Sequence, residues 1–132
     1  MSYYITAKII DVVIPADKLG ECLGAVYKVT REDVDGEEFL LRDKTSLREL
    51  LEYWGIYTRP TEDGGMKLDY VEEGFDGSIG IFEAIAPFVN TDTWPGSPLV
   101  ECCGEDGAMW RFLFEGGKVI RQHPVVTWVN DG

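Results

Sequence analysis

Residues 99–128 have the sequence LVECCGEDGAMWRFLFEGGKVIRQHPVVTW, and this stretch decides the predicted fold. Three runs within it, at 99–103, 108–114 and 118–128, are rich in β-branched and aromatic side chains, as strands are. The middle run alternates aromatic residues with other residues in a period of two. The joining segments, GEDG and GG, supply the glycine and aspartate that tight turns need. The sequence therefore predicts a C-terminal meander of three antiparallel strands.

The adjacent thiols of Cys102 and Cys103 raise the question of a metal or redox site in the first run. Neighbouring side chains of a strand point to opposite faces, which argues against both binding one ion. Zinc sites and redox pairs favour C-x₂-C spacings, which the three cysteines and one histidine do not form. We expect these cysteines to pack as small apolar residues, with no metal and no cofactor; a metal or redox role is the alternative.

The only histidine, His123, precedes Pro124 and is expected to be an extended residue at a bend.

The first third of the chain predicts a strand, a helix and a charged loop. Residues 3–14, YYITAKIIDVVI, form the strand, and its apolar face changes phase at Asp11, which indicates a bulge or burial on both faces. Pro15 suits the first turn of the helix, because a missing N–H costs nothing there. Residues 30–45, TREDVDGEEFLLRDKT, are predicted to be the loop. The buried helix face is predicted to consist of Leu19, Cys22, Leu23 and Val26.

The middle third predicts a helix, a hairpin and a second helix. The stretch Ser46-Leu47-Arg48-Glu49 is a capping box, which marks a helix start. The runs IYTRP (56–60) and MKLDYV (66–71), joined by TEDGG, predict the hairpin. The run SIGIFEAIA (78–86) predicts the second helix. Its buried face is predicted to consist of Ile79, Phe82 and Ile85.

The predicted order of elements is β-α-α-β-β-α-β-β-β. Removing the second helix and the last two strands leaves β-α-β-β-α-β, the ferredoxin-like arrangement. We therefore predict a single α+β domain over residues 1–132, in which two to three helices cover one face of a mainly antiparallel sheet. An odd number of cysteines and the lack of any apolar run near 18 residues predict a reduced, cytoplasmic protein with no membrane contact.

Charge narrows the range of partners. The chain has 24 acidic and 12 basic residues, a formal net charge of −12. Nucleic acids bind through Lys and Arg that neutralise phosphates, so we expect no direct nucleic-acid binding. Such a charge suits a basic protein partner, for example a nuclease or another nucleic-acid-binding protein, or serves solubility alone.

The acidic residues are clustered, and spaced carboxylates can occupy a basic groove in place of phosphates. The alternative is that they are solvated faces and turn residues. Trp94, in the loop NTDTWPGSP, is either an aromatic anchor for a partner or a cover for the core. The candidate partner-binding acids are Glu32, Asp33, Asp35, Glu37 and Glu38 in the first loop, Glu62, Asp63, Asp69, Glu72, Glu73 and Asp76 around the hairpin, and Glu105 and Asp106 at the last hairpin tip.

Motifs for enzymatic chemistry are missing from the sequence. Neither the G-x-G-x-x-G nor the G-x-x-x-x-G-K-[ST] phosphate-binding pattern occurs, and a single histidine limits the options for His-dependent catalysis. We therefore predict a protein that is not an enzyme. A small-ligand protein that binds a nucleotide signal is an alternative function, with Arg59, Arg111 and Arg121 as candidate ligand-binding residues.

Several segments resemble a group of small, acidic, uncharacterised proteins found in gut Gram-positive bacteria and in their phages and mobile elements. The segments are MSYYITAKI (1–9), AIAPFV (84–89), GEDGAMWRF (104–112) and VVTW (125–128). The resemblance implies a phage or mobile-element context, in which small acidic proteins often inhibit host defence, anti-CRISPR proteins among them. The sequence thus predicts an acidic inhibitor of a basic host defence protein; an acidic housekeeping domain is a further alternative.

Overall fold

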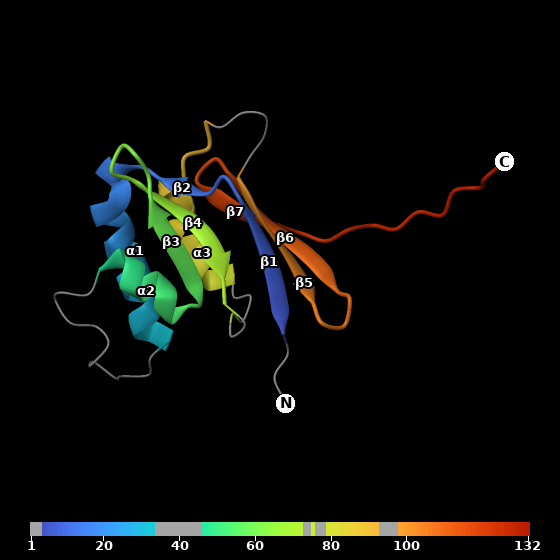
Figure 1. Cartoon of the computed structure of the whole chain (residues 1–132), viewed down its shortest axis with the longest axis horizontal. Coiled ribbons are helices and arrows are strands. Elements are labelled where there is room, and N and C mark those ends of the chain that lie inside the picture. The colour runs from blue at the N-terminus through green and yellow to red at the C-terminus, as the bar shows by residue number, and fades with distance from the viewer. Residues whose placement is uncertain (1–3, 34–45, 73–74, 76–78, 93–97) are drawn as a thin grey trace.

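The computed structural model describes residues 4–33, 46–72, 75, 79–92 and 98–132, and shows helices and antiparallel sheets, so the predicted α+β class is confirmed (Figure 1). The predicted element order is confirmed as well, with the first strand divided in two. In chain order the elements are β1 (Ile5–Ile10), β2 (Val13–Ile14), a 3₁₀ turn (Ala16–Lys18), α1 (Leu19–Asp33), α2 (Leu47–Tyr53), β3 (Ile56–Pro60), β4 (Met66–Val71), α3 (Ile79–Ile85), a second 3₁₀ turn (Ala86–Phe88), β5 (Leu99–Gly104), β6 (Met109–Glu115) and β7 (Lys118–Gln122).

The first strand breaks at Asp11, where the sequence predicts a change of phase. Asp11 has a φ of 52°, in the left-handed region that aspartate tolerates better than most residues. The break turns the chain, so that β1 enters a four-stranded sheet ordered β1-β5-β6-β7 and β2 enters a three-stranded sheet ordered β2-β4-β3. The single sheet that we expected is therefore divided into two, and one run of residues supplies an edge strand to each.

Taken across both sheets, the strands keep the order expected of the β-α-β-β-α-β core. The run formed by β1 and β2 lies between β5, its antiparallel neighbour on one side, and β4, its antiparallel neighbour on the other. The connection that contains α1 and α2 leads from this run to β3, and the one that contains α3 leads from β4 to β5, so that each crossover passes over one intervening strand. This is the split β-α-β arrangement, extended beyond β5 by β6 and β7.

Aromatic packing fixes α3 against the meander. The ring of Phe82 lies 5.9 Å from that of Phe75, 4.8 Å from that of Phe112 and 6.1 Å from that of Phe114, centroid to centroid. All four side chains are buried, and pairs at these distances add to the stabilisation from area burial. The prediction that Ile79 is buried in α3 is wrong. Ile79 is 36% exposed and Ile81 is fully buried instead, so the buried face of α3 consists of Ile81, Phe82 and Ile85.

Helix α1 is longer than predicted and reaches Asp33, so residues 30–33 are helical and the loop prediction is wrong for them. Thr30 lies one turn beyond Val26 on the same buried face and is itself fully buried. Its hydroxyl donates to the Val26 carbonyl (2.7 Å) and accepts from Nε1–H of Trp54 (2.9 Å). The bond to Trp54 joins α1 to the end of α2. The remainder of the predicted loop, 34–45, lies outside the described residues.

Helix α2 begins and ends as the sequence predicts. The Glu49 amide donates to Oγ of Ser46 (3.2 Å), and the Ser46 hydroxyl donates to Oε1 of Glu49 (3.2 Å). Gly55 ends the helix with a φ of 82°. A Cβ at this position would also lie 3.3 Å from Cα of Phe75, so glycine suits both the backbone conformation and the packing.

The final strand is shorter than predicted. It ends at Gln122, whereas the sequence favours a strand to Trp128. Beyond Gln122 the chain is extended and leaves the sheet, as the red segment in Figure 1 shows. Pro124 has no N–H to offer a neighbouring strand, which explains why pairing with β6 stops at this point.

The Thr30 hydrogen bonds predict a specific cost of substitution. Thr30→Val keeps the side-chain shape but leaves the buried indole N–H of Trp54 without its acceptor, so we expect the free energy of unfolding to fall by about 1–3 kcal/mol. Urea denaturation measures it. The matched variant Thr6→Val changes an exposed threonine and is expected to stay within about 0.5 kcal/mol. Equal effects of the two substitutions would show that the Thr30–Trp54 bond contributes little.

Candidate functional site: a tyrosine–carboxylate face and a pocket beside β7

Two tyrosines stack on the surface of the hairpin formed by β3 and β4. Strand pairing places Tyr57 opposite Tyr70, and their rings lie 4.8 Å apart with an interplanar angle of 5°. Tyr70 is 52% exposed. The Tyr57 hydroxyl donates to Oε2 of Glu72 (2.9 Å), so the stack ends at a carboxylate. We call Tyr57, Asp69, Tyr70 and Glu72 the tyrosine–carboxylate face.

The charges of this face are available to a partner. The hydrogen bond to Glu72 raises the pKa of Tyr57 above its usual value, because ionising the phenol would place two anions side by side. The phenol therefore stays protonated and keeps donating to Glu72. Asp69 is exposed and lies 3.9 Å from Nε of Arg59, a long and solvent-screened ion pair that holds neither group tightly.

The predicted acids that the structure describes do not form one continuous surface. Glu62 and Asp63 lie in the turn between β3 and β4, at the opposite end of the hairpin from Glu72. Glu105 and Asp106 lie at the tip of the β5–β6 hairpin in the other sheet, and Glu32 lies at the end of α1 (Figure 1). Of the members of the central cluster that the structure describes, Asp69 and Glu72 belong to the tyrosine–carboxylate face.

Two of the predicted acids close turns. Oδ1 of Asp63 accepts from the Thr61 hydroxyl and from the Gly65 amide (3.3 Å), and the Thr61 bond is the main reason that the Asp63 pKa is lowered. Oδ1 of Asp106 accepts from the Ala108 amide (3.0 Å) in the same way. For these residues the structure favours the turn role that the sequence left as the alternative.

Several candidate residues lie outside the described part of the chain. Asp33 is described only as a helical residue, without its side chain. The prediction that Glu32 and Asp33 lie in a loop is wrong, because α1 runs to Asp33. The remaining candidates lie outside the described residues, and their partner-binding role stays a prediction. They are Asp35, Glu37, Glu38, Glu73, Asp76 and the aromatic candidate Trp94.

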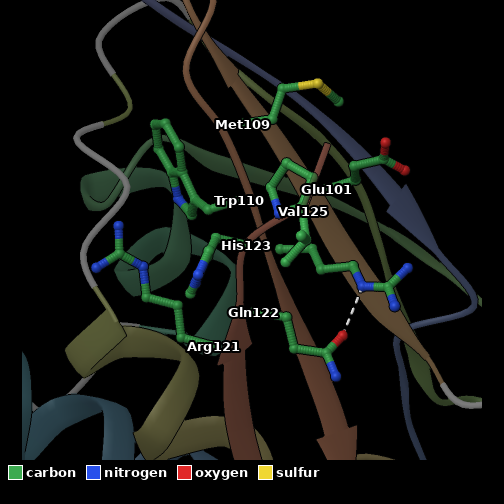
Figure 2. A pocket seen from close by; sticks show the side chains of 9 residues that line it. Glu101, Met109, Trp110, Arg121, Gln122, His123 and Val125 are labelled. Atoms are coloured by element: carbon green, nitrogen blue, oxygen red, sulfur yellow. Dashed lines mark hydrogen bonds between the residues drawn. The ribbon is translucent and has the colours of Figure 1, made fainter. Parts of the chain in front are cut away.

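A pocket of about 670 Å³ opens where the chain leaves β7. In Figure 2 Trp110 and Arg121 lie on one side of the strands, with the Arg121 guanidinium 5.8 Å from the ring centroid of Trp110. Met109 and Glu101 lie on the other side. The lining residues, which we call the β7 pocket, are Glu101, Met109, Trp110, Arg111, Arg121, Gln122, His123, Pro124 and Val125.

Of the three arginines that the sequence offers for a ligand, two line the β7 pocket. Arg111 is opposite Gln122 in the strand pairing, and its Nε–H donates to Oε1 of Gln122 (2.6 Å). Arg121 is opposite Phe112, one residue along, so the two guanidinium groups project from opposite faces of the sheet. Arg59 lies in the three-stranded sheet and does not line the β7 pocket.

The cysteines alternate as the sequence predicts. Cys102 is fully buried, but Cys103 is exposed, so the expectation that both cysteines pack as apolar residues is wrong for Cys103. Burial raises the pKa of the Cys102 thiol to about 11 and that of the Cys22 thiol to about 12, so both stay protonated at neutral pH. Across the described ranges, His, Cys, Asp and Glu side chains nowhere gather in threes that could hold a metal ion.

Comparisons with known proteins do not assign the chain to a family. No family model, curated protein or solved structure matches the chain. The resemblance to phage and mobile-element proteins therefore stays a prediction. Among the helices of the described segments, none has the length and apolarity that crossing a membrane requires.

The predicted hairpin indicates that Tyr57 and Tyr70 lie near each other, but it does not predict that their rings stack. The predicted strands at 56–60 and 66–71 bring Tyr57 close to Tyr70 once they are paired. The pairing shifts register between Tyr57 and Thr58, however, and an unshifted ladder would not have placed the two rings opposite each other.

The burial of the thiols predicts their reactivity. The thiolate of a cysteine attacks a neutral alkylating reagent, so in the folded protein we expect one fast-labelled cysteine, Cys103. Denatured protein should label at all three cysteines. Mass spectrometry of the intact protein counts the labels, and Cys103→Ser is the control that should remove fast labelling. Fast labelling of Cys22 or Cys102 in the folded state would contradict the packing described above.

Proposed function

We propose that this chain is a non-enzymatic binding protein that engages a basic protein through its tyrosine–carboxylate face. The observation that carries the proposal is the exposed Tyr57–Tyr70 stack, which is hydrogen-bonded to Glu72 and whose Tyr70 directly follows the exposed Asp69 in β4. Tyrosines are enriched among the residues that dominate binding energy, and carboxylates beside them select arginine or lysine on the partner.

The geometry of the face suits an arginine in particular. A guanidinium can lie over the exposed ring of Tyr70 as a cation–π contact while it donates to the carboxylate of Glu72 or Asp69. The rings are already stacked and Tyr57 is already bonded, so little side-chain freedom is lost on binding. The rest of the net charge of −12 acts at longer range and speeds the encounter with a basic protein.

The biological setting that we propose follows from the partner chemistry. Nucleases and other nucleic-acid-handling proteins carry the basic surfaces that such a face selects. An inhibitor of a host defence nuclease, anti-CRISPR-like and acting in the host cytoplasm, fits this chemistry and the resemblance noted in the sequence. Because the described acids are spread over separate elements, the support lies in the tyrosine–carboxylate face and not in a phosphate-like row of charges.

The test of the face uses charge-matched variants against a panel of purified basic nucleases, CRISPR effectors included. We expect Glu72→Gln and Tyr70→Ala to weaken binding at least about tenfold, as residues at the centre of an interface do. Glu105→Gln removes the same charge from the other sheet and should change affinity by less than about threefold. Calorimetry measures the affinities. Equal losses of affinity in Glu72→Gln and Glu105→Gln would show that binding depends on net charge alone and not on the tyrosine–carboxylate face.

Defence inhibition is tested in cells. Expression of the chain in a CRISPR-carrying host should restore plating of a targeted phage, and the Tyr70→Ala chain should restore it less. A panel in which no nuclease binds at low ionic strength, together with no rescue of plating, would remove the proposal.

A second candidate function is the binding of a small anionic ligand, such as a nucleotide, in the β7 pocket. The observation that favours it is that Arg111 and Arg121 both line one pocket in a strongly acidic chain, and that Trp110 offers a ring for stacking. Its volume of about 670 Å³ is within the usual range for small-molecule sites. The opposed directions of the two arginines are the argument against it.

Thermal denaturation across a panel of mononucleotides, cyclic nucleotides and cyclic dinucleotides tests this second candidate. A ligand that binds only the native state must raise the melting temperature, and Arg121→Gln should abolish the increase. Melting temperatures that are unchanged across the panel would remove this candidate and would leave the protein-binding proposal untouched.

A further inference from the structure

Residues 123–132 form an extended arm that leaves the sheet after β7 (Figure 1). The arm carries large apolar side chains in full contact with solvent: Val125 is 82% exposed, Val126 78%, Trp128 94% and Val129 81%. Single exposed apolar residues are ordinary, but four within five positions make a contiguous patch, which marks an interaction site. Residues 123–130 also contain no Asp, Glu, Lys or Arg, in a chain with a net charge of −12.

The sequence of the arm is complementary to itself. Residues 125–129 read VVTWV, and the pattern is nearly symmetric about Thr127. In a two-fold symmetric antiparallel pair, the residues facing each other lie at equal distances from the central one, and both point to the same face. Pairing centred on Thr127 sets Val125 opposite Val129, Val126 opposite Trp128 and Thr127 opposite its own copy. Every apolar residue then meets an apolar residue, and threonine meets threonine, which are favourable cross-strand pairs.

We propose that two copies of this chain associate by antiparallel pairing of their arms about a two-fold axis through Thr127. The pairing supplies the neighbour that the arm lacks within its own sheet. The sequence predicts a strand through Trp128, yet continuing the β6–β7 register would set Pro124 opposite Met109, where proline has no N–H to donate. The backbone N–H and C=O groups of residues 125–129 then form hydrogen bonds with the arm of a second copy instead of with β6.

The base of the arm gives the paired ribbon a surface to rest on. A two-stranded ribbon alone is only marginally stable, so it needs apolar cover. Val125 lines the β7 pocket together with Met109, which is 45% exposed. In the proposed register the partner's Val129 lies beside Val125 and extends this apolar wall. The two copies of Trp128 lie diagonally across the other face, within reach of each other.

Size and charge agree with self-association. Two arms bring two tryptophans and six valines together, and a buried tryptophan alone covers about 150–250 Å². The accessible surface buried on both copies together is on the order of 1,000 Å², which is the lower bound for a specific interface. A basic partner would find no carboxylate on residues 123–130, whereas a second copy meets an uncharged surface. Because each copy carries −12, added salt screens their repulsion and strengthens the pairing.

Sedimentation of the full chain tests the association. We expect a mass of about twice 14.8 kDa to appear as the protein is concentrated from low micromolar to about millimolar, and to appear earlier at ~0.5 M than at ~0.05 M NaCl. Val126→Asp and Trp128→Asp should remain monomeric with unchanged melting temperatures. Tyr4→Asp alters a tyrosine that is 50% exposed directly before β1, and this variant should still associate. A monomer at every concentration, or a dimer that survives both arm variants, overturns the proposal.

Cross-linking tests the register. In a Cys103→Ser background, Thr127→Cys places two thiols opposite each other across the axis, at a Cα separation of about 4.5–5.5 Å that suits a disulfide. Under mild oxidation it should cross-link at least about tenfold faster than Val126→Cys, whose thiol faces the partner's tryptophan. Equal rates at the two positions would indicate random collisions of arms and would overturn the pairing. Binding to a nuclease through Tyr70 is independent of these variants, so failure here leaves the proposed function standing.

Discussion

The contacts of Phe82 with Phe112 and Phe114 are the interaction on which the rest of the structure depends. They join α3, which follows the three-stranded sheet along the chain, to β6 at the centre of the meander. Through this contact the two sheets share one core, although the strand common to both is broken at Asp11. The same contact holds β6 and β7 in place, and with them the β7 pocket and the base of the arm. This aromatic cluster thus sets where the β7 pocket and the base of the arm lie.

The two proposed surfaces, the tyrosine–carboxylate face and the arm, are expected to respond to salt in opposite ways. The tyrosine–carboxylate face combines charge with aromatic area, and salt weakens such contacts because the attraction between unlike charges is screened. The arm is apolar and uncharged along residues 123–130, and salt favours its pairing because it reduces repulsion between two acidic bodies. The faces lie in different sheets, so a dimer formed by the arms leaves each Tyr57–Tyr70 stack accessible and presents it twice. Two linked sites raise the apparent affinity for a partner with a repeated or symmetric surface.

Local signals in the sequence predict the helices and strands well, whereas features that depend on contacts between distant residues are harder to predict. The capping box at Ser46, the hairpin at 56–71 and the alternation before Phe114 each depend on neighbours along the chain, and the structure confirms them. The end of α1 was missed because Thr30 is a polar residue in a charged run, and only its bonds to Val26 and Trp54 explain its burial. The division into two sheets depends on one left-handed residue, which sequence pattern indicates only as a change of phase. The candidate site was the least predictable part, since Tyr57 and Tyr70 meet only through a shifted register.

Amide hydrogen exchange along the arm measures the central claim most directly, because two-fold antiparallel pairing protects alternate residues. In concentrated protein the account predicts slow exchange at either residues 125, 127 and 129 or residues 126 and 128, with fast exchange at the intervening positions. Dilution should return all of them to fast exchange while the amides of β6 stay protected. Uniformly fast exchange from 125 to 129 at every concentration would contradict the account.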